Sequence, residues 1–162
     1  MVLDMEVEII NRASLQRILY RNLRYKKYAV ISFYGDNEQQ INFTVNPNVK
    51  YIEKNINDLR EVENPDNWHF YDFDQIAKFI LECEDNGIEY IFCECETGTS
   101  RSAGCAMAIR EFYYGDGIRV FSIYGYNPNP VFYNNIYNSL IRRDKVNKRK
   151  VTNKCIEESF GL

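Results

Sequence analysis

The octapeptide Cys95-Glu96-Thr97-Gly98-Thr99-Ser100-Arg101-Ser102 carries the strongest structural signal in the chain. It places a thiol and a guanidinium six residues apart, on a segment with one glycine and several hydroxyls. An apolar run over residues 88–93 precedes it, as in a buried strand, and small residues follow it, as at the start of a helix. A strand, a tight loop and a helix in this order present backbone N–H groups to an anion. The octapeptide therefore predicts an anion-binding loop with Cys95 at its mouth.

The chemistry of the two end residues favours a phosphate as the anion. The helix dipole and the charge of Arg101 both favour the thiolate form of Cys95. The planar guanidinium of Arg101 matches two phosphate oxygens. We interpret Cys95 as a nucleophile aimed at a bound phosphate. The alternative is a buried structural cysteine in an ordinary turn between strand and helix, and the Cys-x5-Arg spacing alone does not exclude it.

The octapeptide resembles the signature of the cysteine-dependent protein phosphatases, His-Cys-x-x-Gly-x-x-Arg-Ser, and specifically that of their dual-specificity branch. The positions that match are Cys95, Gly98, Arg101 and Ser102. The resemblance spans roughly residues 29–140 and is greatest to small microbial members, which carry a late Tyr-x-Pro-Asn-Pro element. Residues 126–130, Tyr-Asn-Pro-Asn-Pro, match that element. The resemblance implies a phosphatase that hydrolyses phosphate monoesters through a phosphate held covalently on Cys95.

The resemblance also implies roles for the loop residues. Cys95 attacks phosphorus, Arg101 binds phosphate oxygens, and the hydroxyl of Ser102 donates to the sulfur and helps it leave. The backbone amides that would hold the phosphate belong to Glu96, Thr97, Gly98, Thr99, Ser100 and Arg101. The implied substrate is a protein phosphorylated on tyrosine, serine or threonine, or a small phosphomonoester, and no cofactor is expected.

The leaving group needs a proton, and the resemblance implies an aspartate on a loop directly after a strand. Asp58 fits that description, within Ile-Asn-Asp-Leu at residues 56–59. Asp66 lies closer to Cys95 in the sequence, within Asn-Pro-Asp-Asn-Trp at residues 64–68. Glu63 has the most typical separation but is the wrong acid. We favour Asp58 over Asp66 as the general acid.

Glu94 occupies the position where the family has its histidine. That histidine helps to organise the loop and to keep the thiol acidic, whereas a carboxylate facing the sulfur would oppose ionisation of the thiol. Two outcomes follow. Either Glu94 hydrogen-bonds loop amides from outside the pocket, or the activity is low or lost.

The other cysteines suggest two further interpretations. Cys93 and Cys95, with Cys83 and Cys105, could form a metal site, but Cys-x-Cys at the end of a strand is a poor match to zinc spacings, so no metal is expected. Cys93 could instead protect Cys95 through a reversible disulfide. The simpler interpretation is that Cys93 is a small buried hydrophobic residue.

Length and composition place limits on the remaining questions. The 162 residues form a single phosphatase-like domain, 1–162, with a basic C-terminal extension over 144–162. The net charge of −3 argues against a nucleic-acid partner. The basic run over 142–150 is either a solvated helix end or a docking patch. Neither a signal peptide nor a membrane-spanning run is expected, so we predict a cytoplasmic protein with reduced thiols and no membrane partner.

Hydrophobic periodicity predicts an α/β fold: one domain with a mainly parallel central sheet, helices on its faces and the phosphate-binding loop between the central strand and a helix. Helices are expected over residues 14–24, with Ser14 as the cap, and over 73–84, 102–114 and 130–143. Strands are expected over 28–33, 49–56 and 88–93.

Two other functions remain open at this point. One is a catalytically inactive domain of the same fold that binds phosphate or phosphoproteins. The other is a phosphotransfer or sulfurtransferase-like enzyme that uses a cysteine loop, although that class typically lacks an arginine at this spacing.

Overall fold

The computed structural model describes residues 5–21, 27–59, 69–122 and 125–160, with side chains as far as residue 145. Its elements follow one another as β1 (Glu6–Asn11), α1 (Arg12–Arg21), β2 (Tyr28–Tyr34), a 3₁₀ turn η1 (Phe43–Val45), β3 (Lys50–Asn55), α2 (Phe70–Asp85), β4 (Tyr90–Cys95), α3 (Arg101–Tyr114), α4 (Arg119–Ser122) and α5 (Pro130–Phe160).

The four strands form one parallel sheet in the order β1-β4-β2-β3. β4 lies inside the sheet and pairs with β1 on one side and β2 on the other. In a parallel sheet the carboxyl ends of all strands meet at one edge, which is where ligands bind in this class of fold. Cys95 ends β4 at that edge, in register with Asn11 of β1. The predicted single-domain α/β fold with a parallel sheet is confirmed.

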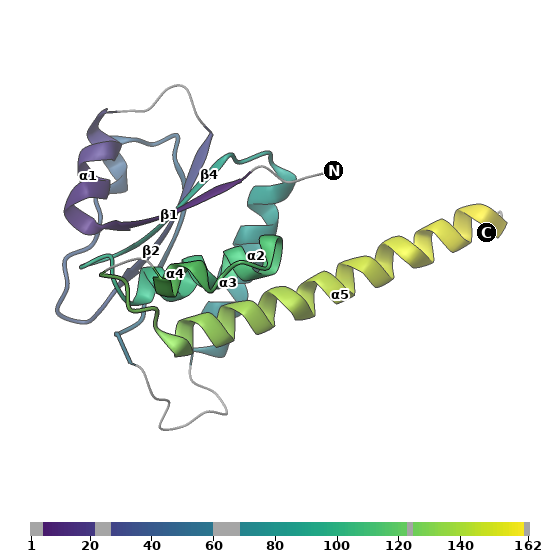
Figure 1. Cartoon of the computed structure of the whole chain (residues 1–162). Coiled ribbons are helices and arrows are strands. Elements are labelled where there is room, and N and C mark those ends of the chain that lie inside the picture. Colours follow the sequence, from purple (N-terminus) through teal and green to yellow (C-terminus); the bar gives the residue numbers. More distant parts are fainter. Residues whose placement is uncertain (1–4, 22–26, 60–68, 123–124, 161–162) are drawn as a thin grey trace.

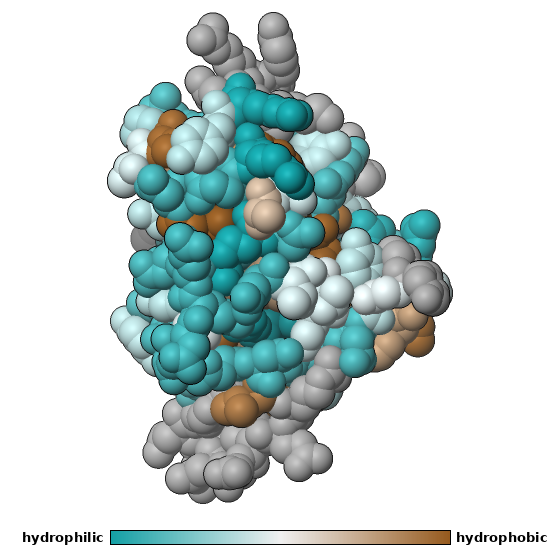
Figure 2. All heavy atoms as spheres, turned by 90° about the vertical axis from the view of Figure 1, so that its left-hand side faces the viewer, coloured by the Kyte–Doolittle hydropathy of each residue, from teal (hydrophilic) through white to brown (hydrophobic). Residues whose placement is uncertain are grey.

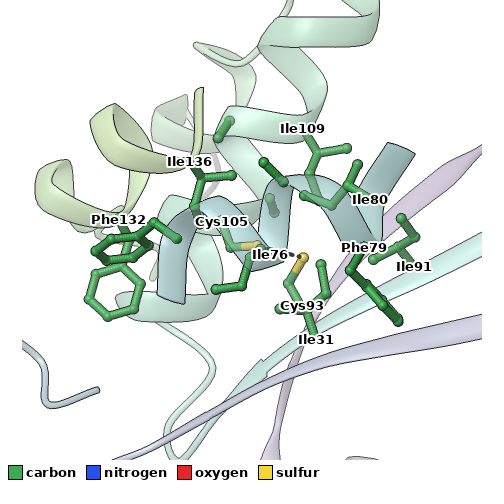
Figure 3. Packing of buried hydrophobic residues seen from close by; sticks show 14 of the residues in the cluster. Ile31, Ile76, Phe79, Ile80, Ile91, Cys93, Cys105, Ile109, Phe132 and Ile136 are labelled. Carbon is green, nitrogen blue, oxygen red and sulfur yellow. Dashed lines mark hydrogen bonds between the residues drawn. The ribbon is translucent and has the colours of Figure 1, made fainter. Parts of the chain in front are cut away.

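Helices cover both faces of the sheet (Figure 1). The larger core lies between one face and α2, α3 and α5, where Phe132 packs edge-to-face on Phe33 and Phe73 with ring centroids 5.0 and 5.2 Å apart. Figure 3 shows Cys93 of β4 and Cys105 of α3 pointing toward each other within this core. The smaller core lies under α1 and η1 and includes Phe92.

Because side chains alternate along a strand, β4 sends successive residues to different cores. Cys93 and Cys95 belong to the core beneath α2, α3 and α5, whereas Phe92 belongs to the core beneath α1. Glu94 therefore faces the α1 side, away from the side that carries the Cys95 sulfur. This alternation separates the unusual carboxylate from the candidate nucleophile.

The structure differs from the sequence-based expectation at several elements. β1 and the short α4 were not predicted. α1 begins at Arg12, because the side-chain oxygen of Asn11 accepts a hydrogen bond of 2.8 Å from the backbone N–H of Ser14; Asn11, and not Ser14, is the cap. α5 begins at Pro130 as expected but continues to Phe160, so its C-terminal half extends away from the rest of the chain (Figure 1). Within the described residues, none of the helices combines the length and the apolar character needed to cross a bilayer.

Candidate active site

The loop from Cys95 to Arg101 joins β4 to α3 and packs against the end of β1. Gly98 has φ of +67°, and a Cβ there would lie 2.8 Å from the backbone nitrogen of Asn11. A side chain at this position would meet both backbone strain and a clash with main-chain atoms. The glycine of the motif is therefore required by the close approach of the loop to β1.

Hydrogen bonds from neighbouring segments hold the carbonyl oxygens of the loop. The carbonyl of Thr99 accepts from the backbone N–H of Asn127 at 2.8 Å, and that of Ser100 accepts from the backbone N–H of Asn129 at 3.0 Å. Both donors belong to the Tyr-Asn-Pro-Asn-Pro element, residues 126–130. This element thus fixes the loop from the α5 side.

Cys95 and Ser102 are both buried and adjacent. The sulfur of Cys95, the last residue of β4, lies 3.1 Å from the hydroxyl oxygen of Ser102 in the first turn of α3. The structure therefore brings together the predicted nucleophile and the hydroxyl that was predicted to assist it.

Arg101 is buried, with 4% of its surface exposed. Its NH1 donates to the carbonyl of Ile56 at 3.1 Å and its NH2 to Glu38 Oε2 at 2.6 Å. Its Nε is buried and has no hydrogen-bond partner among the described residues. An unpaired buried donor costs free energy, so this nitrogen is suited to an anionic acceptor.

Glu38 was not anticipated from the sequence. It lies after β2, and its carboxylate contacts Arg101 at 2.6 Å and lies 3.9 Å from Arg12 NH1. Burial alone would raise the pKa of Glu38, but the hydrogen bond from Arg101, with further hydrogen bonds, outweighs it and lowers the pKa to about 2. Glu38 is therefore a carboxylate at neutral pH and restrains the Arg101 side chain. The local sequence around Glu38 indicates only a turn.

Asp58 lies beside the loop, as the preferred acid should. Its Oδ1 accepts a hydrogen bond of 2.6 Å from the Ser100 hydroxyl and one of 2.8 Å from the side-chain amide of Asn129. The competing candidates Asp66 and Glu63 lie outside the described residues. The structure thus brings Asp58 to the loop.

Asn129 is a second residue that sequence reasoning missed, although its motif was noted. Its Nδ2 donates to Asp58 and to the carbonyl of Leu59, and its Oδ1 accepts from the backbone N–H groups of Val131 and Phe132. Asn129 caps α5 and simultaneously anchors the loop that carries Asp58.

Glu94 is fully buried on the α1 side of the sheet. Its Oε1 accepts a hydrogen bond of 2.9 Å from Arg12 Nε, and its Oε2 accepts one of 2.5 Å from the hydroxyl of Ser32. Burial raises the pKa of Glu94, although Ser32 and Arg12 oppose that shift. Among the described residues, the hydrogen-bond partners of the Glu94 carboxylate are therefore the side chains of Arg12 and Ser32, and the loop amides of the first alternative are not among them.

The positions of the cysteines bear on two interpretations from the sequence, a metal site and a protective disulfide between Cys93 and Cys95. The sulfur of Cys93 lies 3.7 Å from that of Cys105, so its sulfur contact is with α3 and not with Cys95. Burial raises the pKa of Cys93 well above its usual range. Across the part of the chain that the structure describes, no group of three or more His, Cys, Asp or Glu side chains is placed to hold a metal ion.

Proteins of known structure share this fold. No protein-family model and no curated protein matches the chain. Among solved structures, that of DUSP15 covers 92% of this chain and 94% of its own at 20% identity, with a TM-score of 0.60. PTPMT1 in complex with PI(5)P covers 93% and 97% at 13% identity, with a TM-score of 0.54. The human tyrosine phosphatase-like serine/threonine/tyrosine-interacting protein covers 84% and 85% at 19% identity, with a TM-score of 0.51. The chain has the fold of the dual-specificity and tyrosine phosphatases.

Proposed function

We propose that this protein is a phosphatase that hydrolyses phosphate monoesters of the phosphotyrosine or phosphoserine/threonine type through a phosphate carried on Cys95. The observation that carries the proposal is the buried, unpaired Nε of Arg101. It belongs to a loop that begins at Cys95 and is hydrogen-bonded through Ser100 to Asp58. A nucleophile, an anion-binding donor and an acid therefore converge on one loop.

The first chemical step forms a bond between Cys95 Sγ and phosphorus and breaks the bond from phosphorus to the leaving oxygen. Arg101 and the backbone amides of residues 96–101 hold the phosphate oxygens. Asp58 gives its proton to the leaving oxygen, so that the product departs as an alcohol or phenol. The enzyme is left with a phosphorylated Cys95 and an ionised Asp58.

The second step restores the enzyme. Asp58 takes a proton from water, the water oxygen attacks phosphorus, and the bond between sulfur and phosphorus breaks. Ser102, whose hydroxyl lies 3.1 Å from the sulfur, donates a hydrogen bond to the departing thiolate. Inorganic phosphate is released.

A catalytically inactive, phosphate-binding domain is the second candidate. Glu94 favours it, because the histidine of the phosphatase signature is missing. The burial of Glu94 against Arg12 and Ser32 favours the active alternative, since the carboxylate is neutralised on the far side of β4.

The test is hydrolysis of p-nitrophenyl phosphate by the whole protein and its Cys95→Ser variant. We expect turnover by the parent protein, loss of all but a few per cent in Cys95→Ser, and a phosphate on Cys95 after rapid denaturation during turnover. Cys83→Ala, a buried thiol on α2, is the matched control and should remain active. Vanadate binding without turnover in the parent protein would establish the inactive domain instead.

A further inference from the structure

A polar groove runs beside the candidate active site and has no role in the chemistry proposed above. It has a volume of 560 Å³ and lies between α1 and the segment before η1. Its lining includes Arg12, Gln16, Tyr20, Gln40, Asn42 and Glu96. Because Glu96 lines the groove and belongs to the phosphate-binding loop, the groove borders that loop. A substrate whose phosphate occupies the loop would place its neighbouring groups here.

The wall of the groove is preformed. The side chain of Gln16 donates to the carbonyl of Asn42 at 3.1 Å and accepts from its backbone N–H at 2.8 Å. This pair of hydrogen bonds fixes the segment before η1 against α1. Figure 2 shows the side of the molecule that carries α1, and its surface there is mostly hydrophilic. A polar, extended ligand fits such a surface better than an apolar chain or a lipid bilayer.

The charges around the groove favour a cation. Arg12 is paired with the buried Glu94, at 2.9 Å, although its NH1 is buried without a hydrogen-bond partner among the described residues, and Arg101 is paired with Glu38, at 2.6 Å. Glu96 is exposed and has no ion-pair partner among the described residues. A phosphate bound to Arg101 would add further negative charge next to Glu96. A second anionic group in this place would therefore be repelled, and a positive one attracted.

Glu38 and Glu96 strengthen this argument. The neighbouring side chain of Glu38, through hydrogen bonding and through its negative charge, raises the pKa of Glu96. When both are ionised the two like charges repel across a short distance. A positively charged side chain of a ligand, placed at Glu96, would relieve that repulsion.

Building on the proposed function, we infer that the substrate is a phosphorylated peptide segment that lies in this groove, and that Glu96 selects a lysine or arginine close to the phosphorylated residue. The neutral amides of the groove suit a peptide main chain, which offers donors and acceptors along its length. Ligands with several phosphates are disfavoured at the same place by Glu96.

The inference is tested by binding to the Cys95→Ser variant, which separates recognition from turnover. Three phosphotyrosine peptides are compared by calorimetry, identical except for Lys, Ala or Glu next to the phosphotyrosine. We expect the Lys peptide to bind about fivefold more tightly than the Glu peptide, the size expected for one exposed attraction and one exposed repulsion. The preference should shrink as salt is raised. Inositol trisphosphate should bind more weakly than the Lys peptide.

A second substitution in the same background assigns the preference to one residue. Glu96→Gln should reduce it to less than twofold, and Glu96→Lys should reverse it. Glu82→Gln, which removes an exposed carboxylate from α2, is the matched control and should keep it. Equal binding of the Lys and Glu peptides, a preference that survives Glu96→Gln, or tighter binding of inositol trisphosphate would overturn the inference. The proposed function fails separately, if the parent protein hydrolyses no phosphate monoester.

Discussion

The side-chain amide of Asn129 donates a hydrogen bond of 2.8 Å to Oδ1 of Asp58, 71 residues earlier in the chain. The Ser100 hydroxyl donates to the same oxygen at 2.6 Å. With two donors on Oδ1, the proton of a protonated Asp58 belongs on Oδ2. Asn129 and Ser100 therefore determine both where the carboxyl group lies and which of its oxygens can deliver a proton.

Replacement of Asn129 tests this positioning role. Asn129→Asp keeps an oxygen for the cap of α5 but loses the N–H donor to Asp58 and adds a like charge. We expect kcat for phenyl phosphate, a poor leaving group, to fall about tenfold or more, because small misplacements of a catalytic group are costly. For p-nitrophenyl phosphate the fall should be several-fold smaller, since its leaving group needs less protonation.

Asn135→Ala provides the control for Asn129. Asn135 lies one turn further along α5 than Val131. Its side-chain amide donates a hydrogen bond to the carbonyl of Val131, and Asp58 is not among its hydrogen-bond partners in the described part of the chain. Its kcat should match that of the parent protein for both substrates. If Asn129→Asp slows the two substrates equally, Asn129 acts through the stability of α5 and not through the acid.

Replacement of the acid itself should show the same dependence on leaving group in stronger form. Asp58→Asn should lower kcat by ~10²–10³-fold for phenyl phosphate, the usual size of a general-acid contribution. The limb of the pH–rate profile that reports the general acid should change as well. Asp66→Asn is the comparison. If Asp66→Asn shows this pattern and Asp58→Asn does not, Asp66 is the acid and the assignment to Asp58 is wrong.

Arg101 should act through the shape of its guanidinium as well as through its charge. Arg101→Lys keeps the charge but cannot contact Ile56, Glu38 and a phosphate together. We expect kcat/KM to fall at least ~10²-fold, which corresponds to about 2.7 kcal/mol of transition-state stabilisation. A fall of less than tenfold would make Arg101 peripheral.

Replacement of Glu38 should lower kcat/KM less than replacement of Arg101 does, and by a factor that stays constant with pH. Because its pKa is lowered to about 2, Glu38 is ionised in the folded protein at every pH from about 4 to 7. Glu38→Gln should therefore reduce kcat/KM by a similar factor over that whole range. The measurement is the ratio of the two pH profiles. A ratio that rises toward one below pH 5 would mean that Glu38 loses its charge there.

The candidate site was predictable where its pattern is local and unpredictable where it depends on topology. The octapeptide at 95–102 follows directly on a buried strand, contains a glycine and leads into a helix, so its conformation could be inferred. β1 was missed because its side chains are exposed or only partly buried, with an interrupted alternation. Glu38 and Arg12 reach the loop only through the order of strands in the sheet, which no local spacing encodes. The partner of Glu94 depended on the same strand order.

The last prediction concerns the Arg12–Glu94 pair. Breaking a buried ion pair from one side leaves an uncompensated charge, so Arg12→Met should lower the free energy of unfolding by about 3 kcal/mol or more. Glu94→Gln keeps a hydrogen-bond acceptor for Arg12 and removes the buried charge, so its loss should be smaller. The double variant Arg12→Met/Glu94→Gln should be more stable than Arg12→Met alone. Urea unfolding of the three variants measures these differences.

The pH dependence of stability gives this prediction a definite sign. Burial raises the pKa of Glu94 above its ordinary 4.5, so the folded protein holds that proton more tightly than the unfolded chain does. The contribution of Glu94 to stability is therefore greatest below about pH 4.5 and declines as the pH rises through the folded-state pKa. Glu94→Gln lacks this contribution. The free energy of unfolding of Glu94→Gln, relative to that of the parent protein, should increase from pH 4 to pH 8. If it falls over this range instead, Arg12 stabilises the ionised carboxylate more than burial opposes it.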